Sequence, residues 1–231
     1  MWPRLLAELI GTFALVFVAT GSIMVDEVSG GAVTHLGVAV TPGLVVAAMI
    51  YAVGDISGAH FNPAVTWGFW LSGRLRPREA VGYVAAQLAG ATLASFTLWL
   101  LLPGRPAEMG ANLPSVPAVP AVAFEVVLTF LLMFVILGVS GNLHPGAPVR
   151  REASAGVAVG GFVALAIWFA GPTSAASMNP ARAFAPALFA GTPLRFLWIY
   201  LAGPLLGAAL AAGCGRALRR GTEAAGRGPF R

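Results

Sequence analysis

The chain matches itself without a gap when it is shifted by 117 residues, and this internal repeat limits the possible folds more than any other feature. Glu8 falls on Glu125, and an Asn-Pro-Ala tripeptide falls on a second copy of itself. General apolar similarity would not keep Glu, Asn and Pro in register. The two halves of the chain are therefore predicted to fold alike. The paired tripeptides are Asn62, Pro63, Ala64, Asn179, Pro180 and Ala181.

The composition places both halves in a bilayer. Apolar residues make up 58% of the chain and charged residues 10%, whereas soluble domains carry about 25% charged residues. A membrane span needs about 20 apolar residues. Two shorter apolar segments, which follow Asn62 and Asn179 to about residues 71 and 189, are predicted to be re-entrant half-helices. Six full spans are predicted at about 4–25, 34–54, 79–102, 119–140, 154–171 and 194–215.

Each repeat contains three spans, and this odd number requires the second copy to lie inverted in the membrane. The sequence therefore predicts one all-α membrane domain over 1–231, with six transmembrane helices and two re-entrant half-helices. The inverted repeats cover about 4–102 and 119–215, and a Pro-rich external loop at 103–118 joins them. Inverted repeats place a shared site near the membrane midplane, where broken helices meet. A pore or a central binding site is expected there.

Arginine is distributed unevenly between alternate loops. Eleven arginines fall on one predicted face and three on the other, which predicts that both termini are cytoplasmic. The net charge of +5 lies at segment ends rather than in a basic stripe, so no nucleic-acid partner is expected. The only cysteine, Cys214, excludes an internal disulfide and a thiolate metal cluster, and no metal or cofactor is expected. The eleven are Arg4, Arg74, Arg76, Arg78, Arg150, Arg151, Arg216, Arg219, Arg220, Arg227 and Arg231.

The segments HFNPAVT (60–66) and SMNPARA (177–183), together with the paired glutamates, resemble the major intrinsic protein family, the aquaporins and their relatives. The resemblance covers about residues 4–215. It implies a right-handed helix bundle, a passive channel with one pore per protomer, and a homotetramer in the lipid bilayer. The sequence contains no Ser/His, paired-Asp or HExxH constellation, so an enzyme is not expected. A secondary transporter is the alternative of another class, because inverted repeats also occur there.

The paired Asn-Pro sequences also have a direct physical interpretation. Each Asn is predicted to cap its half-helix, with Pro at the first helical position. The amide NH2 groups of Asn62 and Asn179 are then left to donate into the pore, where two positive helix ends meet. Such a site passes neutral hydroxylic molecules and opposes protons and cations. The alternative is that both side chains act only as caps.

Three further polar side chains lie close to these motifs or inside the spans. The symmetric positions of Glu8 and Glu125 predict that they accept hydrogen bonds from backbone N–H groups of the two non-helical loops, and a proton relay is the alternative. His60 lies two residues before Asn62. It is interpreted either as an imidazole that lines the cytoplasmic vestibule or as a structural histidine.

The resemblance also assigns four positions to a solute filter, counted from the two Asn residues. By that resemblance Arg182 donates to solute oxygen and repels cations. Pro42 is unusual within a span, and a kink there would bring Thr41 or Gly43 toward the filter. The four filter positions are Pro42, Ile167, Ala176 and Arg182.

The filter residues and the run at 170–188 predict the solute range. Strict water channels of the family resemble one another in carrying Phe and His where this chain has Pro42 and Ile167, so a wider and more apolar opening is expected. The run AGPTSAASMNPARAFAPAL is similar to the plant nodulin-like intrinsic proteins and their bacterial relatives. That subgroup implies glycerol, urea and neutral boric, silicic or arsenous acid as solutes, with a strict water channel as the alternative. The absence of Lys with abundant Ala, Gly and Arg suggests a bacterial inner membrane.

Overall fold

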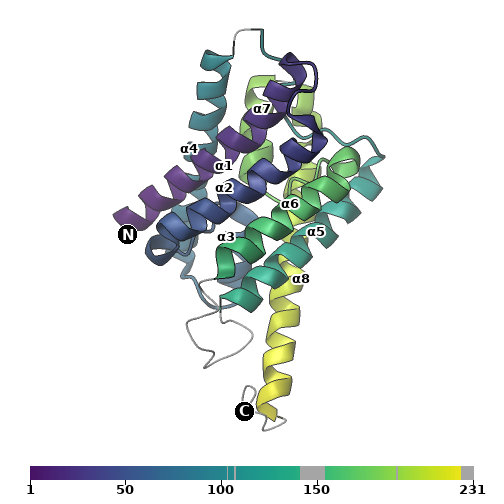
Figure 1. Ribbon diagram of the computed structural model, residues 1–231. Helices are drawn as coiled ribbons and strands as arrows, with labels where there is room; N and C mark the ends of the chain where they lie inside the picture. The colour runs from purple at the N-terminus through teal and green to yellow at the C-terminus, as the bar shows by residue number, and fades with distance from the viewer. Residues whose placement is uncertain (103, 107, 141–153, 191, 225–231) are drawn as a thin grey trace.

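The computed structural model describes residues 1–224 except 103, 107, 141–153 and 191. The described residues form eight α-helices and a short 3-10 helix, and none of them lies in a strand (Figure 1). Six of the helices are long and apolar enough to cross a membrane. The predicted all-α membrane fold is thus confirmed. In chain order the elements are α1 (Trp2–Val28), α2 (Thr34–Ser57), α3 (Pro63–Leu71), α4 (Pro77–Leu101), α5 (Ala118–Val139), α6 (Ala155–Ser174), α7 (Pro180–Ala190), η2 (Thr192–Phe196) and α8 (Leu197–Ala224).

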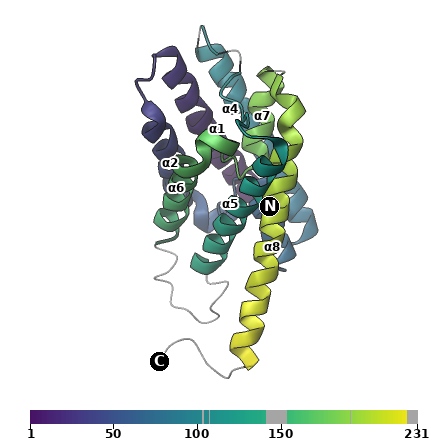
Figure 2. The same cartoon turned by 90° about the vertical axis from the view of Figure 1, so that its right-hand side faces the viewer.

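Most of the long helices extend beyond the predicted apolar segments. Hydropathy detects only the apolar middle of a span, whereas a helix continues until its backbone is capped. Helix α2 therefore runs on to Ser57 and ends where Gly58 adopts a left-handed φ of 88°. The far end of α8 projects beyond the other helices (Figures 1 and 2). Four arginines that support the predicted orientation lie outside the described residues, and these are Arg150, Arg151, Arg227 and Arg231.

The packing of the helices follows the sequence repeat. Helix α1 packs on α4, and its repeat mate α5 packs on α8. Half-helix α3 contacts α8, while its repeat mate α7 contacts α4. Helices α2 and α6, which are repeat mates of each other, lie side by side (Figures 1 and 2). Each half-helix is thus held by a long helix from the opposite half of the chain, so neither repeat completes the bundle alone.

Glycines allow the closest of these helix contacts. A Cβ atom on Gly43 of α2 would collide with the carbonyl oxygen of Gly160 of α6, and a Cβ on Gly160 would collide with that of Gly43. Gly90 and Gly207, which are 117 residues apart, bring α4 onto α1 and α8 onto α5 in the same way. In lipid, where the hydrophobic effect does not drive helices together, such small residues allow close van der Waals contact.

Candidate functional site

The two half-helices begin at the Asn residues of the paired tripeptides. Asn62 has an extended backbone, and its Oδ1 accepts a hydrogen bond from the backbone N–H of Ala64 at 2.8 Å. Asn179 Oδ1 accepts from the backbone N–H groups of Ala181 at 3.0 Å and of Arg182 at 3.4 Å. Pro occupies the first helical position in both α3 and α7. Both Asn side chains therefore cap a helix N-terminus through the oxygen of the amide.

The nitrogen of each Asn amide reaches across to the other repeat. Asn62 Nδ2 donates to the carbonyl of Met178 at 2.8 Å, and Asn179 Nδ2 donates to the carbonyl of Phe61 at 2.9 Å. An Asn amide has two N–H groups. One of them is used in this exchange, so each Asn has one N–H left for a solute rather than the whole NH2 group expected from the sequence. The reciprocal bonds also fix the two half-helices end to end.

Two buried carboxylates hold the loops that precede the half-helices. Glu8 accepts from the backbone N–H groups of His60 at 2.9 Å and Phe61 at 2.8 Å. Glu125 accepts from those of Ser177 at 2.9 Å and Met178 at 2.7 Å. Both glutamates have no exposed surface. Further donors complete the acceptor sets, and these are Ser57 and Gln87 for Glu8 and Ser174 for Glu125.

These loops need such support because their backbone conformation is unfavourable. Ala59 and Phe61 have φ values of 52° and 49°, and the repeat mates Ala176 and Met178 have values of 42° and 52°. Residues with a Cβ rarely adopt this left-handed region, and each such residue costs about 1–3 kcal/mol. In this conformation the backbone N–H groups cannot form helical hydrogen bonds. They donate instead to the two carboxylates.

Sequence analysis missed two tyrosines that fasten the same loops. Tyr83 Oη donates to the carbonyl of Ser57 at 2.7 Å, and Tyr200 Oη donates to the carbonyl of Ser174 at 2.9 Å. Both side chains are buried. The signal was present, because Tyr83 and Tyr200 are themselves 117 residues apart.

The Arg182 guanidinium is held by the Pro-rich segment that precedes α5. It donates through Nη1 to Asn112 Oδ1 and through Nη2 to the carbonyl of Gly110 at 3.2 Å. Asn112 is 2% exposed, and its Nδ2 donates to the carbonyl of Ala175 at 3.4 Å. Asn112 thus connects the arginine to the loop before α7. Nothing in the sequence marked this residue, since it lies in a segment outside both repeats.

A cavity of about 140 Å³ is lined by both Asn62 and Asn179. Its lining runs from Ile23 and Val38, near one pair of helix ends, to Ser140 and Ala155, near the opposite pair. Most of the wall is apolar. Much of it consists of residues 117 apart, so both repeats contribute equivalent positions. Five of these pairs are Leu15 and Leu132, Val46 and Val163, Ile50 and Ile167, Pro42 and Val159, and Val65 and Arg182.

All four predicted filter residues line this cavity, and three of them, Pro42, Ile167 and Ala176, have apolar side chains. The expected kink does not expose Thr41. Helix α2 is continuous through Pro42, and Thr41 Oγ1 donates to the carbonyl of Gly37 at 2.9 Å. Since Thr41 is not among the residues that line the cavity, we no longer assign it to the filter.

His60 agrees with both interpretations made from sequence, because it lines the cavity and is also held by neighbouring side chains. It lines the cavity but is only 8% exposed. Its Nδ1 is 3.1 Å from Thr66 Oγ1, and its ring stacks on Phe69 with centroids 4.5 Å apart. A ring held this firmly presents one edge to the cavity and cannot swing freely. Among the described residues, no group of three or more His, Cys, Asp or Glu side chains is placed to hold a metal ion.

Comparison with known proteins agrees with this geometry. The family model described as Major intrinsic protein matches residues 1–214. The chain is 49% identical over 208 residues to aquaporin NIP1-4 of Oryza sativa subsp. japonica, covering 90% of this chain and 74% of that protein. It is 44% identical to aquaporin NIP1-1 of Zea mays over 89% of this chain and 71% of that protein. The crystal structure of the aquaglyceroporin from Plasmodium falciparum has the same fold, with a TM-score of 0.81, 23% identity, and coverage of 92% of this chain and 94% of that one.

Proposed function

Because the chain belongs to the major intrinsic protein family, we propose that it forms a passive channel for water and small uncharged solutes. The solutes we propose are glycerol, urea and the neutral forms of boric, silicic and arsenous acid. The observation that carries this proposal is that three apolar filter residues and one arginine line the same cavity. A solute with a hydroxyl edge and a carbon or metalloid body matches both kinds of wall.

The apolar character of three filter side chains supports a wide solute range. Pro42, Ile167 and Ala176 have no side-chain donor or acceptor, so they impose no hydrogen-bond pattern on the solute. Water alone gains little from such walls, whereas the carbon atoms of glycerol gain apolar contact. Arg182 supplies donors for hydroxyl oxygens on one side. The name aquaglyceroporin, borne by the Plasmodium protein of the same fold, is consistent with this range.

Three positive groups along the cavity support the exclusion of cations and protons. Arg182 is charged, and the N-terminal ends of α3 and α7 meet at the paired Asn residues. Each helix end carries a partial positive charge of roughly half an elementary charge. A cation at this level would meet repulsion and lose its hydration shell, while a hydroxyl oxygen accepts from the remaining Asn N–H groups. Neutral solutes therefore cross a lower barrier than cations or protons.

A secondary transporter is less well supported by the same residues. Coupled transport needs an ionisable group that can bind the driving ion. The buried carboxylates Glu8 and Glu125 are both fully engaged with loop donors, and Arg182 is held by Asn112. Asp55 lies on an exposed part of α2. Within the described helices, every buried carboxylate already accepts hydrogen bonds from protein donors.

Stopped-flow light scattering on proteoliposomes tests the proposed solute range. We expect water, glycerol and boric acid to enter faster than into protein-free liposomes, with fluxes that do not saturate and do not follow a sodium or proton gradient. Fast water entry without glycerol or boric acid entry would show a strict water channel instead. Flux that follows an ion gradient would show the transporter.

The assembly and orientation are part of the same proposal. We propose a homotetramer, which the family resemblance implies, with both termini cytoplasmic as the distribution of arginines suggests. Native mass spectrometry measures the first, and protease access to tags on each terminus measures the second. The relatives compared are plant proteins, so they support a multi-pass membrane protein but not a bacterial inner membrane.

A further inference from the structure

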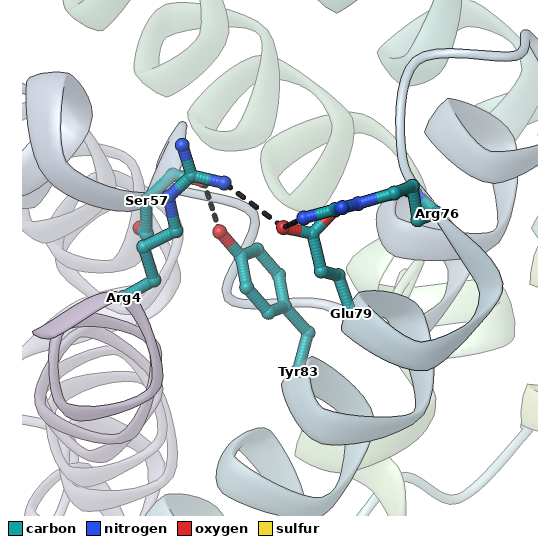
Figure 3. A network of polar contacts seen from close by, with 5 residues as sticks. All are labelled: Arg4, Ser57, Arg76, Glu79 and Tyr83. Carbon is teal, nitrogen blue, oxygen red and sulfur yellow. Dashed lines mark hydrogen bonds and ion pairs between the residues drawn. The ribbon is translucent and has the colours of Figure 1, made fainter. Parts of the chain in front are cut away.

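A cluster of charged residues lies where α1 and α4 begin, far from the filter. Glu79 accepts from Arg4 Nη1 at 3.2 Å and from Arg76 through Nε at 3.1 Å and Nη2 at 3.0 Å. Figure 3 shows Arg4 reaching from α1 and Arg76 from the segment before α4 toward the same carboxylate. Arg78 completes a surface pocket with these three residues. Arg4 and Arg76 share the Glu79 carboxylate, and together with Arg78 the side chains of the pocket carry a net positive charge of two.

The equivalent helix pair of the second repeat packs without such a charged cluster. The equivalent seam between α5 and α8 carries Ala121 at the position of Arg4 and Phe196 at the position of Glu79. There Ala121 is fully buried and packs in an apolar cluster with Tyr200 and partly buried Phe196. Apolar packing thus closes one of two pseudo-equivalent helix pairs. On the α1–α4 seam, Glu79 also accepts from the backbone N–H of Arg76 at 3.4 Å and so caps α4, which accounts for the carboxylate but not for three arginines around it.

The arginines keep donors that no described residue accepts. The side chains of Arg4 and Arg76 are 50% and 83% exposed, whereas that of Glu79 is 11% exposed. A guanidinium has five N–H groups, and the contacts to Glu79 use one from the Arg4 side chain and two from the Arg76 side chain. The remaining donors suit a phosphate group, which Arg binds in a bidentate manner.

The position of the pocket identifies the source of that phosphate. Arg76 and Arg78 lie at the start of the span α4, and Val81, one turn further along, is 72% exposed on the outside of the bundle. Trp2, at the start of α1, is 69% exposed, and Trp is enriched where a span meets the headgroups. Basic pockets between membrane helices bind anionic headgroups. We propose that this pocket binds the headgroup of an anionic phospholipid from the adjoining leaflet.

Lipid titration of the intact protein in detergent, followed by native mass spectrometry, tests this site. Dioleoylphosphatidylglycerol is compared with dioleoylphosphatidylcholine for the wild type and for the double variant Arg76→Gln/Arg78→Gln. Each basic residue near a membrane surface contributes about 1 kcal/mol, or roughly fivefold in affinity. We expect the wild type to prefer phosphatidylglycerol and the double variant to bind it about 25-fold more weakly.

Arg195→Gln provides the matched control, because Arg195 occupies the position of Arg78 in the second repeat. Its guanidinium lies over the Phe196 ring, 4.5 Å from the centroid. We expect Arg195→Gln to keep the lipid preference. Equal weakening by both substitutions, no preference in the wild type, or displacement of the lipid by an equal concentration of inorganic phosphate would each overturn the proposal. Circular dichroism of every variant checks that the helices remain folded.

Discussion

Replacement of either buried glutamate by glutamine tests whether the carboxylates hold the loop backbones. Gln keeps the shape of Glu but turns one acceptor oxygen into an NH2 donor, which then faces a donor of the loop. A buried donor without an acceptor costs about 1–3 kcal/mol, and each remaining bond loses about 1 kcal/mol when its acceptor loses its charge. Glu125 accepts three hydrogen bonds, so Glu125→Gln is expected to lower the free energy of unfolding by about 3–5 kcal/mol.

Glu8→Gln should destabilise the protein by about 1–3 kcal/mol more, because each Glu8 oxygen accepts two hydrogen bonds and replacing either leaves two donors without an acceptor. Glu8 accepts four hydrogen bonds, the additional one coming from Gln87. The loop itself adds a second effect. Ala59 and Phe61 hold left-handed backbones that relax once the acceptor is lost. We therefore expect loss of water flux even in protein that keeps its helices.

Two assays follow these effects. Unfolding in mixed detergent micelles gives the free energy, and stopped-flow light scattering of proteoliposomes gives the water flux per folded protein. Glu27→Gln is the control, since Glu27 is an exposed carboxylate near the end of α1. If Glu8→Gln were no more destabilising than Glu27→Gln, or if it left water flux unchanged, the role of the carboxylate as loop acceptor would be wrong.

Three more substitutions test the filter and the helix contacts. Ile167→His should slow glycerol about tenfold relative to water in proteoliposomes. The substitution removes two CH2 contacts of about 0.8 kcal/mol each, and their loss raises the energy barrier to glycerol. Unchanged glycerol flux would mean that the side chain does not line the constriction. Asn112→Ala should lower the free energy of unfolding by about 1–3 kcal/mol and reduce solute selectivity, since Arg182 loses a buried acceptor; selectivity equal to that of the wild type would contradict this. Gly160→Ala should destabilise the protein by more than about 1 kcal/mol, because the new Cβ collides with a carbonyl of α2. Gly161→Ala places its Cβ in open space and should stabilise the protein by up to about 1 kcal/mol. Unfolding in micelles measures both changes.

Much of the fold could be predicted from the sequence because membrane helices follow directly from hydropathy. With no water in the bilayer core, backbone groups must bond within the segment, so a long apolar run has few alternatives to a helix. The half-helices were also predictable, since Asn-Pro marks a helix start and the apolar run behind it is short. The positions of the helix ends were predicted less accurately. Helix α8 continues to Ala224 through residues that hydropathy scores as polar.

The site was predictable where the repeat provided a second copy and less so elsewhere. The filter positions Pro42 and Ile167 reached the cavity as counted along the chain. The exchange between Asn62 and Met178 could not be predicted, because it depends on two loops that meet only in three dimensions. Asn112 could not be predicted either, since a loop residue outside any periodic pattern carries no sign of what it contacts.

The two repeats are alike in the loop scaffold but differ at the proposed filter. Both halves carry the same capping Asn, the same glutamate and the same tyrosine, so the loop scaffold obeys the pseudo-twofold relation. The filter does not. Arg182 in α7 corresponds to Val65 in α3, and both face the cavity at the third position of their half-helices. In the proposed filter, a charge on one half only would put cation repulsion and hydroxyl binding at one level of the pore. A second arginine opposite would hold a hydroxylic solute at two levels and slow its release, which a passive channel must avoid.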